Sequence, residues 1–94
     1  MSKQPEAYDD EWRRFAQELA VQLRRHRQAT GLSQEEVASR ANLSRFIYRQ
    51  YENAESRRGE PSNPALRAMI AISQVLGVSL SELLPENLPD LRNR

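Results

Sequence analysis

Apolar residues recur at every third or fourth position along most of the chain, and no long stretch alternates apolar and polar residues. This spacing is typical of helices with one buried face, so the sequence predicts an all-α fold. The first helix is expected to begin at Asp9 or Asp10 and to end near Thr30, because Gly31 suits the left-handed end of a helix. The apolar residues of this helix are Trp12, Phe15, Ala16, Leu19, Ala20 and Leu23.

Two short helices joined by a tight turn are predicted next. Ser33 and Glu36 have the spacing of a capping box, which predicts a second helix that starts at the residue after the serine. Asn42 tolerates a left-handed turn, so this helix should end there. Ser44 can then cap a third helix that runs to about Ala54.

The remainder of the chain predicts a loop and two further helices. Residues 55–63 are polar and contain a glycine and a proline, which is typical of a loop. Asn63 and Pro64 have the residue types of the cap and first position of a fourth helix, which Gly77 would close. Ser79 would cap a short fifth helix with the sequence SLSELL.

The length of 94 residues suits a single domain. We expect a flexible N-terminus over residues 1–8, a five-helix domain over residues 9–84, and an irregular tail over residues 85–94, which contains two prolines.

The third helix has an unusual outer face. On a helical wheel of about 100° per residue, Ile47, Tyr48 and Tyr51 gather on one side, which we expect to be buried. Ile47 is expected to be partly buried there rather than to contact a base. The opposite side and its flanks carry Arg45, Phe46, Arg49, Gln50 and Asn53. Two short helices in which the second has a polar outer face form a helix-turn-helix. The second helix of that motif fits the major groove of double-stranded DNA.

Charge is distributed unevenly along the chain. The segment from Arg13 to Arg67 holds 11 arginines and 6 glutamates, whereas the rest of the chain holds 3 basic and 7 acidic residues. The basic middle is the part that could meet a polyanion. Of the 14 basic residues 13 are arginine, whose forked donors suit phosphate and the guanine edge. A bias of genome composition would explain the same preference for arginine.

Other classes of function have little support in the sequence. There is no cysteine, the three glycines form no phosphate loop, and no spacing of His, Asp and Glu indicates a metal site. The only histidine, His26, is expected to line the core, so we expect neither an enzyme nor a cofactor nor a small-molecule ligand. The chain shows no signal peptide and no membrane span, so we expect a cytoplasmic protein.

The sequence resembles a known family over about residues 15–84. The segments LRRHRQATGLSQEEVASRANLSRFIYRQYEN and PALRAMIAISQVLGVSLSELL are similar to the phage lambda repressor-like, or XRE, family of DNA-binding regulators. The resemblance implies a five-helix bundle, here with an extended first helix, whose third helix reads DNA. It also implies a homodimer on a near-palindromic operator, and a dimer would double the few base pairs that one helix reads.

The resemblance and the helical wheel together give the candidate site residues. Candidates for contacts with base edges are Arg45, Phe46, Arg49 and Gln50. Candidates for phosphate contacts are Gln34, Ser44, Asn53, Arg57 and Arg58. Arg27 and Glu52 match a buried pair that ties the first helix to the third in the family. The expected dimer contacts are Leu80, Leu83 and Leu84, unless these leucines only close the core of the monomer.

Several alternatives stay open at this level. Phe46 either lies against a thymine methyl group or packs under the long loop or the fourth helix. Ala54 stands where the family has a glycine, which favours a longer third helix, and the loop after it is about six residues longer than usual in the resemblance. Trp12 and Phe15 either pack on the fourth and fifth helices or form a surface for a protein partner. An antitoxin or a protein-interaction module, with DNA binding secondary, would use the same fold.

Overall fold

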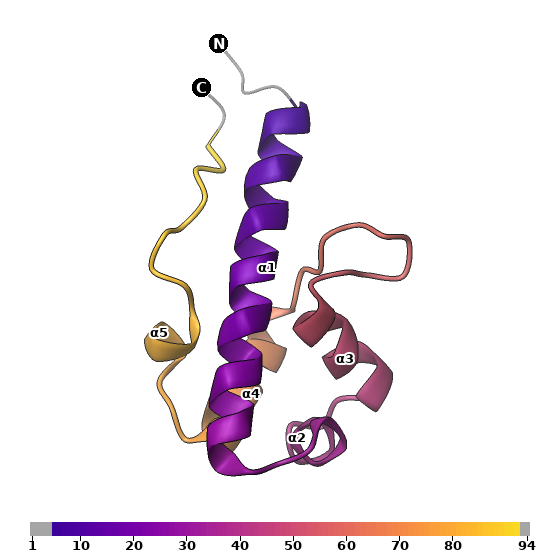
Figure 1. Ribbon diagram of the computed structural model, residues 1–94, viewed down its shortest axis with the longest axis vertical. Coiled ribbons are helices and arrows are strands. Elements are labelled where there is room, and N and C mark those ends of the chain that lie inside the picture. The colour runs from indigo at the N-terminus through magenta and orange to yellow at the C-terminus, as the bar shows by residue number, and fades with distance from the viewer. Residues whose placement is uncertain (1–4, 93–94) are drawn as a thin grey trace.

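The computed structural model describes the backbone of residues 5–92 and the side chains of residues 10–92. These residues form five helices and no strand apart from one isolated bridge between Glu55 and Pro61. The all-α prediction is therefore confirmed. In chain order the helices are α1 (Pro5–Thr30), α2 (Gln34–Arg40), α3 (Arg45–Asn53), α4 (Leu66–Leu76) and α5 (Leu80–Leu83) (Figure 1).

The first helix begins earlier than its sequence predicted. It starts at Pro5, so Asp9 and Asp10 lie inside α1 and the prediction that one of them caps it is wrong. Proline is favoured in the first turn of a helix, where its missing N–H costs no hydrogen bond. Of the expected flexible segment, residues 5–8 are helical and residues 1–4 lie outside the described residues. The N-terminal half of α1 consequently rises beyond the other helices (Figure 1).

The predicted caps of α2 and α3 are confirmed. The hydroxyl of Ser33 accepts from the N–H of Glu36 at 3.0 Å, and the carboxylate of Glu36 accepts from the N–H of Ser33 at 3.0 Å. Asn42 adopts a left-handed conformation with φ 58°, and Ser44 caps α3 by accepting from the N–H of Ile47 at 3.0 Å. These caps are local, so they place the turn between α2 and α3 independently of the rest of the fold.

The end of α3 differs from the expectation of a longer helix. Ala54 takes the left-handed conformation, with φ 62°, and ends the helix at Asn53. This conformation costs about 1–2 kcal/mol for a residue with a Cβ atom. The methyl group of Ala54 is buried against Ala16 and Ala20 of α1, which offsets part of that cost.

The start of α4 also differs from the prediction. Ala65 is extended, with φ −64° and ψ 145°, and α4 begins only at Leu66, so Asn63 and Pro64 are not its cap and first residue. The phenol of Tyr51 is hydrogen-bonded to the backbone of Ala65, which holds this point of the chain against α3. The entry to α4 is therefore set by a tertiary contact and not by a side-chain cap.

The core lies where α1, α2, α3, α4 and α5 meet. Its buried residues are Leu19, Leu23, Val37, Ala38, Ala41, Tyr48, Tyr51, Ala68, Met69, Ile72, Leu76 and Leu83. Leu83 is fully buried, so its assignment to a dimer surface is wrong for this fold, because it closes the monomer core. Leu80 and Leu84 are partly buried and pack against the same core.

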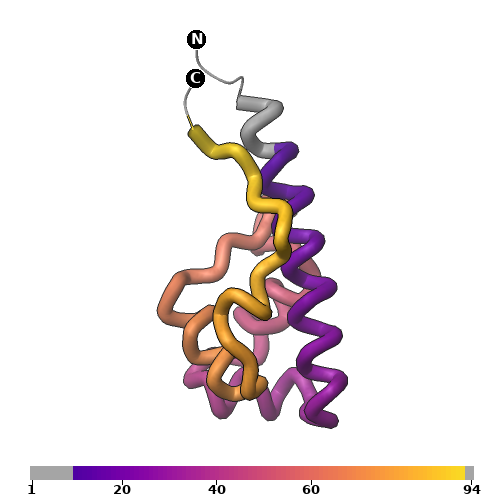
Figure 2. The backbone as a smooth tube through the Cα atoms, turned by 90° about the vertical axis from the view of Figure 1, so that its left-hand side faces the viewer, coloured from indigo at the N-terminus to yellow at the C-terminus, as the bar shows by residue number. Residues whose placement is uncertain are grey.

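The C-terminal tail returns along α1. From residue 85 the described chain contains neither helix nor strand and runs beside the N-terminal half of α1 (Figures 1 and 2). The N–H of Asp90 donates to the carboxylate of Glu11 at 3.2 Å, which fixes the tail there. The opposite flank of this half of α1 carries the loop between α3 and α4 (Figure 1).

Candidate nucleic-acid interface

The outer face of α3 is open to solvent. Arg45, Arg49 and Asn53 are exposed, Gln50 is half-buried, and Phe46 is 59% exposed. The structure thus brings the four candidates for base contacts onto one accessible helix face. Phe46 is therefore not packed under the loop or under α4, which was the alternative to a DNA contact.

Ile47 is more exposed than Tyr48 and Tyr51, the other two residues on the same side of the helical wheel. It was expected to be partly buried, and 36% of its surface is exposed. Phe46 and Ile47 therefore form an exposed apolar pair on the first turn of α3.

The arginine at the start of α3 is weakly restrained. Nη1 of Arg45 lies 3.4 Å from Oε2 of Glu35 on α2, and both side chains are mostly exposed. Exposed pairs of this kind contribute about 0–1 kcal/mol. The guanidinium of Arg45 is consequently free to exchange this partner for a stronger acceptor.

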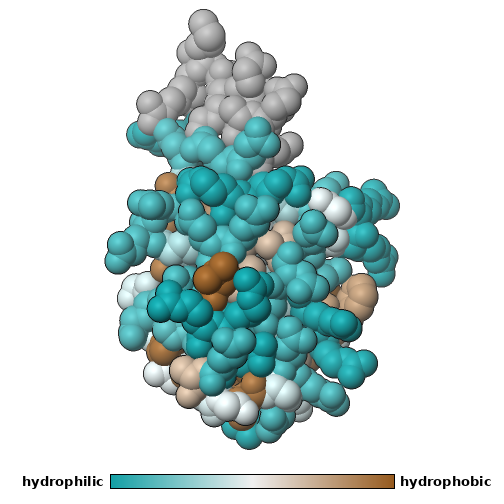
Figure 3. Space-filling view, in the orientation of Figure 1, coloured by the Kyte–Doolittle hydropathy of each residue, from teal (hydrophilic) through white to brown (hydrophobic). Residues whose placement is uncertain are grey.

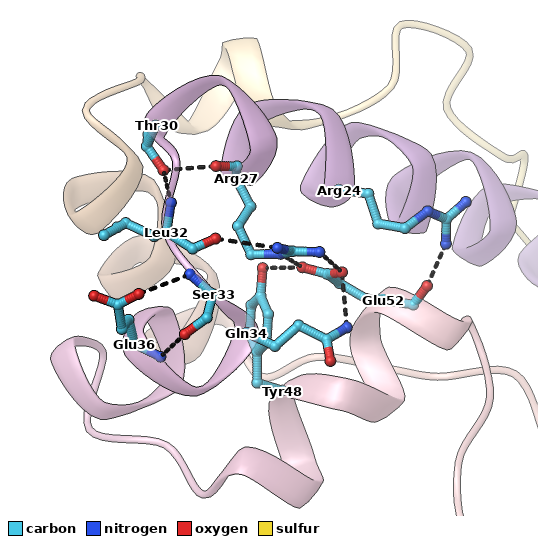
Figure 4. Close-up of polar contacts among 9 residues, drawn as sticks. All are labelled: Arg24, Arg27, Thr30, Leu32, Ser33, Gln34, Glu36, Tyr48 and Glu52. Carbon is cyan, nitrogen blue, oxygen red and sulfur yellow. Dashed lines mark hydrogen bonds and ion pairs between the residues drawn. The ribbon is translucent and has the colours of Figure 1, made fainter.

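Gln34 joins the start of α2 to α3. Its Nε2 donates to Oε1 of Glu52 at 3.0 Å, as Figure 4 shows. An amide nitrogen carries two hydrogens, so one donor of Gln34 remains for another acceptor. The side chain is half-buried and fixed by this bond, which orients the remaining donor. The hydroxyl of Ser44, by contrast, already accepts as the cap of α3.

Glu52 is the centre of a buried hydrogen-bond network beneath the outer face of α3 (Figure 4). The guanidinium of Arg27 donates to both carboxylate oxygens, from Nε at 2.7 Å and from Nη2 at 3.0 Å. The hydroxyl of Tyr48 donates to Oε2, and Gln34 donates to Oε1. Glu52 is fully buried, so its charge depends on these three donors. The structure thus brings together the two residues that the sequence resemblance paired.

The pKa values of the network follow from this geometry. Burial of the Glu52 carboxyl tends to raise its pKa, but the hydrogen bonds from Arg27, Tyr48 and Gln34 outweigh burial and hold that pKa below its usual range. Burial, followed by the bond to the Glu52 carboxylate, raises the pKa of Tyr48 far above its usual value. Tyr48 is therefore a permanent donor and Glu52 a permanent anion at neutral pH.

Tyr48 and Arg24 were not predicted from the sequence as members of this network, and Gln34 was predicted only as a phosphate contact. Tyr48 lies four residues before Glu52, the spacing that puts two side chains on one face of a helix. Arg24 lies three residues before Arg27 and donates to the backbone carbonyl of Glu52, near the C-terminal end of α3. The spacing of these residues was a signal that could have identified both as partners of Glu52.

The loop between α3 and α4 lies beside the outer face of α3. Its tip is a turn in which the N–H of Ser56 donates to the carbonyl of Glu60 at 2.7 Å and the N–H of Gly59 donates to the carbonyl of Ser56 at 3.1 Å. Arg57 and Arg58 are exposed at this tip. The loop and α3 enclose an open groove lined by Phe46, Ile47, Gln50, Ser56, Arg57, Arg58 and Glu60.

Trp12 and Phe15 lie next to each other on α1, with Trp12 partly buried. Phe15 is buried, and its ring lies 5.4 Å from the ring of Trp12. Nε1 of Trp12 donates to the carbonyl of Ser62 at 3.0 Å, at the end of the loop. Trp12 therefore contacts the end of the long loop.

The visible face in Figure 3 is polar, with small and separate apolar areas. Among the described residues, no group of three or more His, Cys, Asp or Glu side chains has the arrangement of a metal site. No helix in this part of the chain combines the length and apolar character needed to cross a membrane.

Of the comparisons with known proteins, the comparison with family models agrees with this geometry. A comparison with curated proteins gives no match. A family model described as a helix-turn-helix domain matches residues 18–84, a region that includes α2, the turn, α3, α4 and α5. The match covers well over half of the chain, so the protein belongs to the helix-turn-helix domain family.

Proposed function

We propose that this protein is a transcriptional regulator of the lambda repressor-like, or XRE, kind that binds double-stranded DNA sequence-specifically. Residues 44–54 would read the major groove. The observation that carries the proposal is the exposed face of α3, on which Arg45, Phe46, Arg49 and Gln50 stand together above a buried network. Side chains of these types recognise base edges in the major groove.

Each side chain on this face has a chemical partner in DNA. The two arginines can each donate two parallel hydrogen bonds to O6 and N7 of guanine, and Gln50 can pair with N6 and N7 of adenine. Phe46 can lie against the methyl group of thymine, which is the apolar feature of the major groove. Ile47, exposed next to Phe46, extends the apolar part of this face.

Phosphate contacts would fix the orientation of the helix. Gln34 has a free amide donor at the start of α2, Asn53 is exposed at the end of α3, and Arg57 and Arg58 are exposed on the loop. Such contacts position a protein on the duplex without reading its sequence. Ser44 is a weaker candidate than the others, because its hydroxyl already serves as the cap of α3.

The proposal includes a two-fold dimer on DNA. One recognition helix reads only a few base pairs, which is too little to select a site among the roughly 10⁶–10⁹ competing sites of a genome. With Leu83 in the monomer core, Leu80 of α5 and Leu84 directly after it are the two candidate leucines that keep some exposed surface for a partner.

Binding to duplex DNA at several salt concentrations tests the proposal. We expect the logarithm of the association constant to fall linearly with the logarithm of the salt concentration, and the protein with Arg45→Gln and Arg49→Gln to bind more weakly. A matched control carries Arg14→Gln and Arg92→Gln, which remove the same charge from exposed positions on α1 and the tail. Equal loss of affinity in both double variants would mean that α3 has no special role.

A further inference from the structure

We infer that the N-terminal half of α1 is a brace that holds the α3–α4 loop in position for DNA, and that Trp12 is a positioning residue for Arg57 and Arg58. The inference rests on the proposed function and adds to it a second DNA-contacting element with its own support. It concerns the loop between α3 and α4 and the N-terminal half of α1, most of which precedes the region that the family model matches.

Both ends of the loop are fixed to α1. At the start of the loop, Ala54 is buried against Ala16 and Ala20, whose small side chains allow a close approach. At its end, Ser62 is 2% exposed, and its N–H donates to the carbonyl of Ala54 at 3.0 Å. These contacts close the base of the loop directly on the helix.

Trp12 also contacts the point where the loop ends. Its indole N–H donates to the carbonyl of Ser62 at 3.0 Å, so both backbone groups of that serine are satisfied. The indole ring packs on Phe15, which is itself buried. A hydrogen bond between residues 50 positions apart thus determines where the loop leaves the body of the protein.

The tip of the loop has a further tie to α1. Nη1 of Arg13 donates to the carbonyl of Gly59 at 3.3 Å, and the turn is closed by the bond from Ser56 to Glu60. Arg57 and Arg58 are exposed on this turn, and the ion pairs found among the described residues include neither of them. Two exposed guanidinium groups are therefore held on a turn that also carries Glu60.

The position of the loop relative to α3 indicates what these guanidinium groups would meet. On one flank of α3, Arg45 contacts Glu35 of α2, and on the other flank Ile47 and Gln50 border the groove shared with the loop. Figure 1 shows α3 between α2 and the loop. A helix with side chains is about 10–12 Å wide and fills the major groove. A segment alongside it therefore lies over the sugar-phosphate backbone that borders the groove.

The contacts with α1 matter because a loop that is not held in place would bind phosphate more weakly. A polar loop without fixed ends samples many conformations, and ordering it on binding costs conformational entropy for every residue. With its base and tip tied to α1, the loop presents Arg57 and Arg58 beside α3 before DNA arrives. Loss of Trp12 should consequently weaken electrostatic contacts that Trp12 itself does not make.

The salt dependence of DNA binding gives a test that a neutral substitution would not otherwise affect. For a short mixed-sequence duplex, the slope of log association constant against log salt is negative. In Trp12→Ala its magnitude should decrease by up to about two units, as in the variant with Arg57→Gln and Arg58→Gln. Adding both arginine substitutions to Trp12→Ala should then change the slope little. Trp12→Phe, which keeps the ring contact and lacks the N–H donor, should lie between wild type and Trp12→Ala.

Two controls separate the parts of the inference. Val21→Ala changes an exposed apolar residue of α1 away from the loop and should leave the slope unchanged. Trypsin cleavage after Arg57 and Arg58, measured without DNA on the folded variants, should be faster in Trp12→Phe and Trp12→Ala because the loop is released. Melting curves identify any variant that is unfolded. If Trp12→Ala is unfolded, the comparison uses Trp12→Phe in its place.

The outcomes are distinct. If wild-type protein binds DNA and the arginine double variant decreases the magnitude of the slope, but both Trp12 variants keep the wild-type slope and cleavage rate, the brace is wrong. If the arginine double variant leaves the slope unchanged, the loop does not contact phosphate and the inference is also wrong. If wild-type protein shows no salt-dependent binding to DNA, the proposed function itself fails.

Discussion

Arg27 of α1 and Glu52 of α3 meet as a forked ion pair, with Nε and Oε2 separated by 2.7 Å and Nη2 and Oε1 by 3.0 Å. The arginine side chain is 16% exposed and the glutamate side chain is not exposed at all. Because Tyr48 and Gln34 bond the same carboxylate, this pair connects the first helix to the floor of the recognition helix. Its geometry leads directly to the first three predictions.

Arg27→Ala should destabilise the protein strongly. The substitution leaves a buried carboxylate with two neutral donors and no cation, and breaking a buried pair in this way costs about 3–5 kcal/mol. Urea unfolding followed by circular dichroism measures the change in the free energy of unfolding. The matched control is Arg25→Ala, an exposed arginine on the same helix, which should stay within about 0.5 kcal/mol of wild type. If Arg27→Ala and Arg25→Ala unfold at the same urea concentration, the ion pair does not stabilise the fold.

Tyr48→Phe should cost about 1.5–3 kcal/mol, because a hydrogen bond to a charged group is lost without a change of shape. Tyr51→Phe is the control, since the phenol of Tyr51 bonds the uncharged backbone of Ala65 and its loss should cost about 0.5–1.5 kcal/mol. Both variants keep the aromatic ring, so differential scanning calorimetry compares the two hydroxyl groups directly. A larger loss in Tyr51→Phe than in Tyr48→Phe would contradict the central place of Glu52 in the network.

The network also predicts how stability depends on pH. The pKa of Glu52 is lower in the folded protein than in the unfolded chain, where a glutamate titrates near about 4.3. The folded state therefore binds fewer protons, and its extra stability is present above that pH and is lost as pH falls through the lowered pKa of Glu52. Acid should destabilise wild-type protein more steeply below about pH 4 than it destabilises Glu52→Gln.

Two other glutamates complicate that measurement and supply its control. The backbone N–H of Ser33 lowers the pKa of the exposed Glu36, and that of Ser79 does the same for Glu82. The comparison is therefore made in a background with Glu36→Gln and Glu82→Gln, with and without Glu52→Gln. If the acid limb of the stability profile is identical with and without Glu52, the carboxylate is not selectively stabilised by folding.

The recognition helix gives a prediction that separates binding from stability. Phe46 is 59% exposed, so Phe46→Ala should change the free energy of unfolding by less than about 0.5 kcal/mol. On DNA it should relax a preference for thymine and leave the salt slope unchanged, because it neutralises no phosphate. Gln50→Ala should relax preference at one or two other positions by roughly 5- to 150-fold. A lowered melting temperature with unchanged site preference would place Phe46 in the core instead.

Half-site spacing tests the proposed dimer. Recognition helices of a two-fold dimer lie on one side of the duplex and read half-sites about 10–10.5 base pairs apart. An insertion of about half a helical turn, roughly five base pairs, should place the half-sites on opposite faces and abolish cooperative binding. Insertion of a full turn is the control for distance alone. Undiminished cooperativity after the half-turn insertion would rule out a rigid dimer.

Local signals in the sequence located α2 and α3 well. The caps Ser33 and Ser44 and the left-handed Asn42 act within a few residues of themselves, so sequence alone places the turn between the two helices. The caps also define the face that α3 presents. The positions proposed for base contact follow from that face together with the family resemblance.

Features set by distant contacts were not predictable from local patterns. The start of α4 depends on a contact between Tyr51 and Ala65, and the exposure of Ile47 depends on which helices flank α3. The burial of Leu83 depends on how α5 closes the core. The bond from Trp12 to Ser62 joins residues 50 positions apart, and no periodicity in the sequence reports it.

Selection of bound sequences from a random pool of duplex DNA tests the central claim most directly. The account predicts enrichment of a near-palindromic motif whose half-sites contain guanine, adenine and thymine at positions that change when Arg45, Gln50 or Phe46 is replaced by alanine. A pool that stays unenriched after repeated rounds at low and at physiological salt, with a protein shown to be folded, would contradict the account.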